Sequence, residues 1–330
     1  MDFLYASDEN YVRHAAVSML SLMDSNRNAE TINIHLLSMG ISEESRERLQ
    51  QLVEGNGRKI FFYELGDIRR WFDFDFDSRG FAASALARLF MARVLPESID
   101  RILYLDCDTV VLEELSPLFR MDMAAYDLGM VAEPTVNKGR RRQLGMRDDQ
   151  PYYNSGVLLV NLHKWRKDRT ETTILDYYRA MGGNLVAPDQ DAINGAVPDR
   201  ILQLQPRYNY GSVQIYYPWK TQRRMSAPTP FMSEDEYRQG TEKPAIVHFL
   251  GEERPWRAGN QHPYTPVYDR YLAQTSWKDT PKDEGWRNYF RCFKLFNLLT
   301  RPIPMLRYRI IDALIPAFMH ARAKKLKKNR

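Results

Sequence analysis

Short apolar runs alternate with helical patterns along most of this chain, and this alternation limits the fold more than any other feature. The apolar runs span residues 3–6, 32–37, 59–63, 101–105, 128–132, 156–161 and 245–249. After the first run, Val12, Ala15, Met19 and Met23 recur at helical spacing. Several runs are apolar without alternation, which favours strands covered by helices on both faces. The sequence therefore predicts an α/β fold with a mostly parallel sheet.

The pattern changes near residue 260. From Pro263 onward the apolar runs stop, and aromatic, basic helical segments follow, interrupted by Pro302, Pro304 and Pro316. We therefore expect residues 1–260 to form one α/β domain and residues 261–330 to form a small, basic, helical C-terminal region.

The net charge of +5 is distributed unevenly along the chain. Residues 287–330 hold twelve Lys and Arg side chains against the single acid Asp312, so the rest of the chain is net negative. Apolar side chains such as Leu298 and Leu314 are mixed with these cations, a composition typical of a helix that lies on anionic lipid. A solvated helix or a disordered end is the alternative. Because the cations gather in one tail, we do not expect a nucleic-acid-binding protein.

Cysteine content and hydropathy bear on the compartment. Cys107 and Cys292 cannot supply a disulfide framework or a four-thiolate zinc site, which favours a reducing compartment. No apolar stretch approaches the roughly 20 residues that a spanning helix needs. We expect a cytoplasmic protein that attaches peripherally to the inner face of the membrane through residues 287–330.

Four Asp-x-Asp spacings occur, and only one follows an apolar run directly. Asp106 and Asp108 come immediately after the run that ends at Leu105. Ligands of α/β sheets bind at the carboxyl ends of strands, and paired carboxylates there suit Mg²⁺ or Mn²⁺. The alternative is that the two acids cap a helix starting near Leu112.

Two other strand ends carry polar residues. Asp8, Asn10 and Tyr11 follow the first run, where they either cap the next helix or receive a base and a ribose. His248 lies in an apolar run ahead of Gly251; it is either a core residue or a ligand that suits Mn²⁺ better than Mg²⁺.

Two segments have open interpretations. Val136–Tyr152 holds three consecutive arginines and is either a lid over the site or a solvated basic loop. Tyr216–Trp219 belongs either to the core or to a surface for an acceptor sugar.

Taken together, six motifs resemble glycosyltransferase family 8, in particular the bacterial lipopolysaccharide galactosyl- and glucosyltransferases. They are Asp8-x-Asn10-Tyr11, Arg88 in Ala85–Leu89, Leu103–Asp108, Tyr153–Leu159, Asp189–Asn194 and His248-x-x-Gly251-x-x-Arg254-Pro255-Trp256. They extend over about residues 1–260. The resemblance implies the GT-A fold, a Rossmann-like nucleotide-sugar-binding fold, carrying here a basic C-terminal extension.

The resemblance also implies an activity, the transfer of galactose or glucose from a UDP-sugar to a lipopolysaccharide or another surface glycan with retention at the anomeric carbon. It assigns a Mn²⁺ ion, or Mg²⁺, to Asp106, Asp108 and His248. It assigns the nucleotide to Ala6, Asp8, Asn10, Tyr11, Cys107, Gly251 and Arg254. It assigns the hexose to Arg88, Asp106, Asn154, Asp189 and Gln190, with Gln190 and Asp189 as the catalytic residues. The alternative is a non-catalytic, membrane-associated UDP-sugar-binding protein on the same fold.

Three positions depart from the family pattern. Arg254 replaces a phosphate-contacting Lys and keeps its charge. Glu133 replaces an Asp of the sugar site, and Gly80 falls near a His that lines the donor site. The last two differences leave galactose and glucose both open as the transferred sugar, and the acceptor is not encoded by any single motif.

Overall fold

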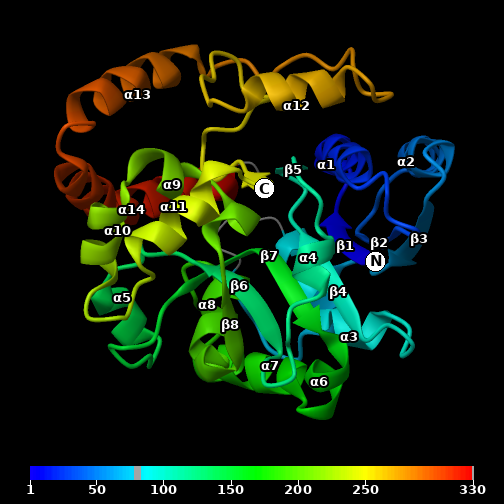
Figure 1. The fold of residues 1–330 in the computed structure, drawn as a ribbon, viewed down its shortest axis with the longest axis horizontal. Helices are drawn as coiled ribbons and strands as arrows, with labels where there is room; N and C mark the ends of the chain where they lie inside the picture. The colour runs from blue at the N-terminus through cyan, green and yellow to red at the C-terminus, as the bar shows by residue number, and fades with distance from the viewer. Residues whose placement is uncertain (78–82, 329–330) are drawn as a thin grey trace.

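A seven-stranded mixed sheet forms the centre of the computed structural model, which describes residues 1–77 and 83–328, with the backbone alone at residues 83, 316 and from 318 onward (Figure 1). From edge to edge its strands are β3 (Lys59–Glu64), β2 (Asn33–Ser38), β1 (Asp2–Ser7), β4 (Arg101–Leu105), β7 (Tyr153–Asn161), β6 (Leu128–Ala132) and β8 (Ile201–Leu204). Strand β7 runs antiparallel to both β4 and β6, and the other neighbours are parallel. The predicted strands are confirmed, and β8 was not predicted.

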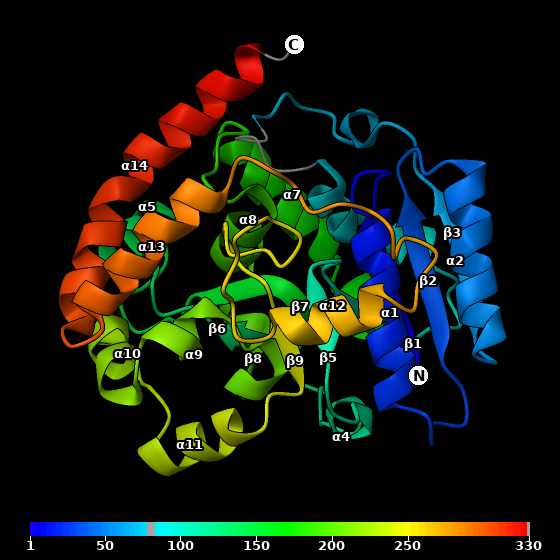
Figure 2. The same cartoon turned by 90° about the horizontal axis from the view of Figure 1, so that it is seen from above.

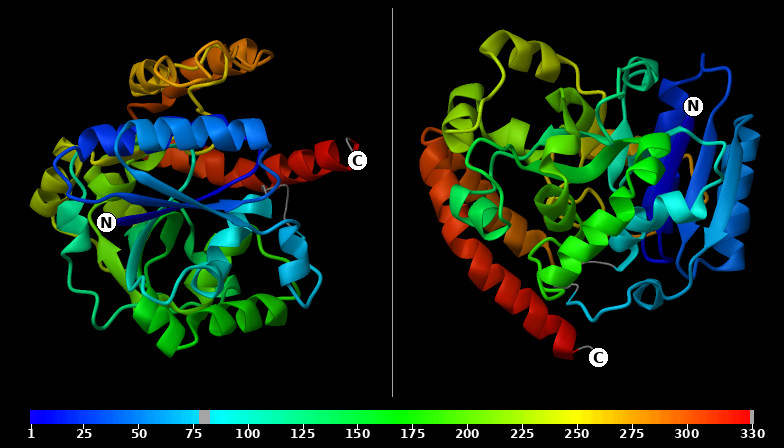
Figure 3. Two further views of the ribbon diagram at one scale, coloured as in Figure 1. Left: turned by 90° about the vertical axis from the view of Figure 1, so that its right-hand side faces the viewer. Right: turned by 90° about the horizontal axis from the view of Figure 1, so that it is seen from below.

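Helices cover both faces of this sheet (Figure 3). On one face lie α1 (Val12–Ser25) and α2 (Glu43–Gly55). On the other lie η2 (Ala83–Phe90), α3 (Met91–Val94), α6 (Leu162–Lys167) and α7 (Thr170–Ala180). Strand β1 therefore sends Phe3 and Tyr5 into the first core, and Leu4 and Ala6 into the second. Because both faces of β1 are buried, Phe3 to Ala6 are apolar without alternation, as the sequence indicated.

Local signals explain where two of the helices begin. The Ser42 hydroxyl accepts a hydrogen bond from the Ser45 amide at the start of α2, and Glu43 and Glu44 follow in its first turn, where the helix dipole favours acids. Helix α8 (Pro188–Ala196) opens with a proline, whose missing N–H costs nothing at that position. This start places Asp189 and Gln190 in the first turn of α8.

A second, two-stranded sheet lies beside the first and pairs β5 (Thr109–Val111) with β9 (Ile246–His248). The remaining elements connect these layers. They are η1 (Ile68–Trp71), α4 (Ser116–Phe119), α5 (Lys138–Gln143), η3 (Pro198–Arg200), η4 (Pro206–Asn209), α9 (Ser212–Tyr216), α10 (Trp219–Ser226) and α11 (Glu234–Glu242).

The C-terminal segment crosses the molecule, and its last helix passes beside α5 (Figure 2). Helix α12 (Thr265–Leu272) packs on α1, where the Tyr268 hydroxyl lies 2.6 Å from Nδ1 of His14. Helices α13 (Arg287–Thr300) and α14 (Pro304–Lys328) follow. Within residues 1–77 and 83–328, no helix is both long and apolar enough to cross a bilayer.

Candidate active site

Most of the predicted site residues meet where β1 and β4 end, at the carboxyl ends of these strands, around a cavity of about 430 Å³. Because β7 runs antiparallel to β4, its first residues lie at the same edge as the last residues of β4. The predicted residues that line the cavity are Ala6, Tyr11, Arg88, Asp106, Cys107, Asp108, Asn154, Asp189, Gln190, His248, Gly251 and Arg254. Asp8 and Asn10 lie in the loop before Tyr11 and do not line it.

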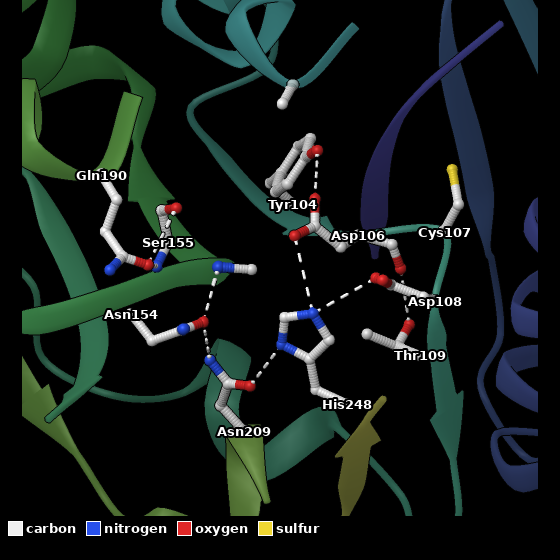
Figure 4. Close-up of polar contacts among 12 residues, drawn as sticks. Tyr104, Asp106, Cys107, Asp108, Thr109, Asn154, Ser155, Gln190, Asn209 and His248 are labelled. Carbon is white, nitrogen blue, oxygen red and sulfur yellow. Dashed lines mark hydrogen bonds and ion pairs between the residues drawn. The ribbon is translucent and has the colours of Figure 1, made fainter. Parts of the chain in front are cut away.

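Asp106, Asp108 and His248 form a cluster with the geometry of a metal site (Figure 4). The pairing of β5 with β9 places Thr109 opposite His248, and this register brings the imidazole beside the acidic pair. His248 Nε2 lies 3.2 Å from Asp108 Oδ1 and 3.7 Å from Asp106 Oδ2. Each residue offers one ligand atom, and all three atoms lie within 4.8 Å of one another. Two carboxylates and one imidazole are a donor set that suits Mn²⁺.

A chain of hydrogen bonds fixes which nitrogen of His248 carries the proton (Figure 4). The Gly156 amide can only donate, so Asn154 Oδ1 accepts from it at 2.9 Å. That oxygen also accepts from Asn209 Nδ2 at 2.8 Å, which turns Asn209 Oδ1 toward His248 Nδ1 at 2.9 Å. Nδ1 therefore holds the proton, and the lone pair of Nε2 faces the two carboxylates, as a metal ligand requires.

Gly156 lets the His248 ring approach β7. A Cβ atom at this position would lie 2.1 Å from His248 Cε1 and 2.9 Å from Asp106 Oδ2. Any larger residue would push the imidazole away from the acidic pair, so the metal-binding geometry depends on this glycine.

Two arginines balance the acidic pair, Arg88 fully buried and Arg254 partly buried. Arg88 Nη2 donates to Asp106 Oδ1 at 2.7 Å, and Arg254 Nη2 lies 3.3 Å from Asp108 Oδ2. Burial raises the pKa of Asp106 above its ordinary value, against the opposing effect of Arg88. Burial also acts to raise the pKa of Asp108, but the positive charge of Arg254 is the largest opposing effect, and that pKa lies below its usual range. The cavity thus combines a carboxylate pair with two fixed cations, a combination that suits a metal-bound phosphate.

The loop after β1 is a turn rather than a helix cap. Asp8 Oδ1 accepts hydrogen bonds from the amides of Asn10 and Tyr11 at 3.0 and 3.2 Å. Helix α1 begins one residue later without a side-chain cap. The turn directs the Tyr11 hydroxyl to a hydrogen bond with Arg254 and leaves the ring at the cavity. Asp106 and Asp108 likewise cap no helix, because β5 follows them.

Gln190 is held in one orientation. Its Oε1 accepts from the Ser155 amide at 3.1 Å, and its Nε2 donates to the Tyr152 hydroxyl at 3.1 Å. Tyr152 can accept this bond because its own proton is donated to Asp191. Asp189 Oδ2 accepts from the Ser155 hydroxyl at 2.8 Å and lies 3.3 Å from Arg88 Nε. These contacts fix both side chains beside the space left for a sugar.

Two of the three consecutive arginines in Val136–Tyr152 bind to the rest of the domain, so the segment is not a solvated loop throughout. Arg140 Nη2 reaches both oxygens of Asp191, at 2.7 and 2.9 Å. Arg141 is buried and donates to the carbonyl of Gln150 at 2.8 Å. The segment thus supports Gln190 indirectly, through Asp191.

Sequence reasoning missed several of these contributors. Asn209, Ser155 and Tyr152 orient site residues. Ser155 lies in the motif Tyr153–Leu159 but received no role, and nothing in the sequence separates Asn209 and Tyr152 from ordinary polar residues of turns and strands. Asp191 lies in one of the Asp-x-Asp spacings and in the motif Asp189–Asn194, and neither signal indicated that it orients Tyr152 and Arg140. Glu133 is buried and lines three neighbouring cavities rather than this one, and Gly80 lies outside the described residues.

Comparison with known proteins identifies the family of the chain. The model of Glycosyl transferase family 8 matches residues 2–259. General stress protein A of Bacillus subtilis is 29% identical over 280 residues, which cover 84% of this chain and 94% of that protein. The lipopolysaccharide 1,2-glucosyltransferase of Escherichia coli is 24% identical over 288 residues, covering 86% and 81% of the two chains.

Solved structures with the same architecture are also glycosyltransferases. The galactosyltransferase LgtC, solved in complex with donor and acceptor sugar analogues, is 25% identical, with a TM-score of 0.71 over 87% of this chain and 99% of that chain. GlyE of Streptococcus pneumoniae is 22% identical with a TM-score of 0.59, and its likeness concerns the fold alone. The predicted GT-A fold is therefore confirmed.

Proposed function

The chain belongs to glycosyltransferase family 8, and on that premise we propose that it is a retaining hexosyltransferase that uses a UDP-sugar and Mn²⁺. The single observation that carries the proposal is the cluster of Asp106, Asp108 and His248, with its Nε2 lone pair free, in one cavity with Gln190 and Arg254. A metal-bound diphosphate and a hexose fit such a cavity.

Asp106, Asp108 and His248 would hold the ion, which supplies positive charge to the diphosphate when bound. Arg254 contributes a second positive charge on the same side. Negative charge grows on the departing UDP, so a fixed cation stabilises the transition state more than the ground state. Ala6, Tyr11, Cys107 and Gly251 would enclose the nucleotide, and Asp8 and Asn10 would approach it from the adjoining loop.

Arg88, Asn154, Asp189 and Gln190 would surround the hexose, together with Asp106. An amide is a weak nucleophile, so we favour attack of the acceptor on the same face from which UDP departs. Gln190 Oε1 and the Asp189 carboxylate would then stabilise positive charge at the anomeric carbon, and the departing UDP oxygen would take the proton of the acceptor hydroxyl. An α-linked product from an α-linked donor is expected by NMR, and an inverted product would refute this geometry.

The first experiment measures UDP release from a panel of UDP-sugars, with Mn²⁺ and with EDTA. We expect turnover with UDP-galactose or UDP-glucose that EDTA abolishes. Asp106→Asn should abolish turnover while the thermal unfolding curve stays cooperative. UDP binding without turnover on any donor would support the alternative of a non-catalytic sugar-nucleotide-binding protein, and neither binding nor turnover would reject both.

For the acceptor, we propose a lipopolysaccharide core or another surface glycan. The support is the resemblance in the first 260 residues and the similarity to the lipopolysaccharide 1,2-glucosyltransferase of Escherichia coli. Whether the donor is UDP-galactose or UDP-glucose is decided by the same panel, because the two sugars differ in one hydroxyl that buried polar groups can distinguish strongly.

We further propose that residues 287–330, within the C-terminal region 261–330, attach the protein to anionic lipid at the inner face of the cell membrane. Leu295, Leu298, Leu299 and Ile303 are each more than half exposed beside the basic residues of this segment. Leu298→Ser with Leu299→Ser should reduce co-sedimentation with phosphatidylglycerol vesicles, while Phe61→Ser, at an exposed site on β3, should not. Unchanged co-sedimentation of the double variant would contradict the attachment.

A further inference from the structure

A groove of about 520 Å³ runs between α5 and α14 and reaches Gln190. Gln190 also lines the donor cavity, so the two spaces meet at this side chain. In the proposed reaction the donor hexose lies beside Gln190, and the attacking hydroxyl must approach the same carbon from outside the nucleotide cavity. The groove supplies that approach.

The lining of the groove has the chemistry of a sugar site. Its polar side chains include Asn137, Arg140, Gln143, Gln190 and Asp312, and Ile315 adds an apolar surface. Amide and carboxylate groups match the donor and acceptor capacity of sugar hydroxyls. The volume is within the range of pockets that hold small ligands.

The charge of the groove disfavours a phosphorylated ligand. Arg140 is the one cation among the described lining residues, and its charge is already offset by the two oxygens of Asp191. Glu133 and Asp312 add two carboxyl groups to the same lining. An anionic group placed here would meet like charge without a free counter-charge, so the groove suits an uncharged saccharide.

A neighbouring cavity extends the groove. It has a volume of about 280 Å³, shares Asp312 and Ile315 with the groove, and carries the rings of Tyr216, Tyr289 and Tyr308. Aromatic rings offer flat apolar faces against which the C–H faces of a sugar can pack. The combined space has room for more than one sugar unit.

Helix α14 is held firmly enough to act as a wall. Asn137 Nδ2 donates to Asp312 Oδ1 at 2.8 Å, which ties α14 to the start of α5 (Figure 2). Arg307 is 3% exposed, and its guanidinium carbon lies 4.1 Å from the centre of the Tyr216 ring. Asp312 and Ile315 therefore stay at the rim of the groove through contacts with the body of the protein.

We propose that the groove between α5 and α14 binds the acceptor, that the part of the acceptor held there is an uncharged oligosaccharide, and that Asp312 and Ile315 of the C-terminal helix form one wall of its site. The proposal rests on the transferase function above. It makes α14 part of the acceptor site, beyond any role at a membrane.

The test uses the full chain with Mn²⁺ and whichever UDP-sugar the wild type hydrolyses. UDP release is measured without acceptor and with lactose, maltose or glucose 6-phosphate. Ile315→Trp fills the groove from a side chain that is 37% exposed, so the fold should tolerate it. Ala313→Trp, on an exposed position of the same helix that lines neither cavity, is the matched control.

We expect lactose or maltose to stimulate UDP release, and Ile315→Trp to raise the KM for that sugar at least about tenfold, equivalent to about 1.4 kcal/mol. Ala313→Trp should leave both this KM and the release without acceptor unchanged. A wild-type KM in Ile315→Trp, a preference for glucose 6-phosphate, or no stimulation by any of these sugars would overturn the inference. Failure of the wild type to bind or hydrolyse every UDP-sugar would instead overturn the proposed function, and the inference with it.

Discussion

Replacement of Asn209 by leucine tests the hydrogen-bond chain that orients His248. Asn209 is buried, accepts from His248 Nδ1 at 2.9 Å and donates to Asn154 Oδ1 at 2.8 Å. Leucine has a similar volume and makes neither bond. At about 1 kcal/mol for each hydrogen bond, the free energy of unfolding should fall by about 2 kcal/mol. The imidazole is then free to change its tautomer and its orientation, and loss of such an outer contact weakens metal binding by about 10- to 100-fold.

The assay is calorimetric titration with Mn²⁺, together with urea unfolding. Asn161→Leu is the control, because Asn161 caps α6 and donates to the Met123 carbonyl at the opposite end of β7. It should lose a similar amount of stability and keep the Mn²⁺ affinity of the wild type. Wild-type Mn²⁺ affinity in Asn209→Leu would refute the reasoning that the hydrogen-bond chain fixes the tautomer.

Three further changes probe other contacts. Tyr152→Phe removes the hydroxyl that accepts from the Gln190 amide, so kcat should fall about tenfold while the KM for the donor stays constant; a change confined to KM would contradict the positioning role. Gly156→Ala should weaken Mn²⁺ binding by about 100-fold because the new methyl group enters the space of the His248 ring, and calorimetry would detect unaltered binding if this is wrong. Burial lowers the pKa of His262 from 6.5 to about 4, so the unfolded state takes up a proton first as the pH falls. Stability present above pH 6.5 should thus decrease by up to about 3 kcal/mol toward pH 4, and His262→Phe should remove this share of the acid loss in urea unfolding.

The direction of a strand illustrates one limit of sequence reasoning. The apolar run at 156–161 predicted a strand, and the strand exists, but the run is equally apolar in either direction. That β7 is antiparallel to β4 follows from the path of the chain around the sheet. This direction brings Asn154 and Ser155 to the edge where β4 delivers Asp106.

Short strands illustrate another limit. The three residues of β5 are too few to show the periodicity of a strand, so β5 was not predicted. Yet β5 holds the register with β9 that places His248 beside Asp108. Without that pairing the histidine has two open interpretations, a core residue or a ligand, and the register is what brings its imidazole beside the acidic pair.

The sequence by itself determined the order of strands and helices, the chemistry available at each strand end, and the motifs shared with glycosyltransferase family 8. These properties are local, since each depends on a few residues that are close along the chain. Only the tertiary structure decided that Asn209 fixes the tautomer of His248, that Tyr152 and Asp191 fix Gln190, and that α14 lines a groove beside the site. Those contacts join residues tens to more than a hundred positions apart, and their partners are chosen by strand register and helix packing rather than by neighbouring residues.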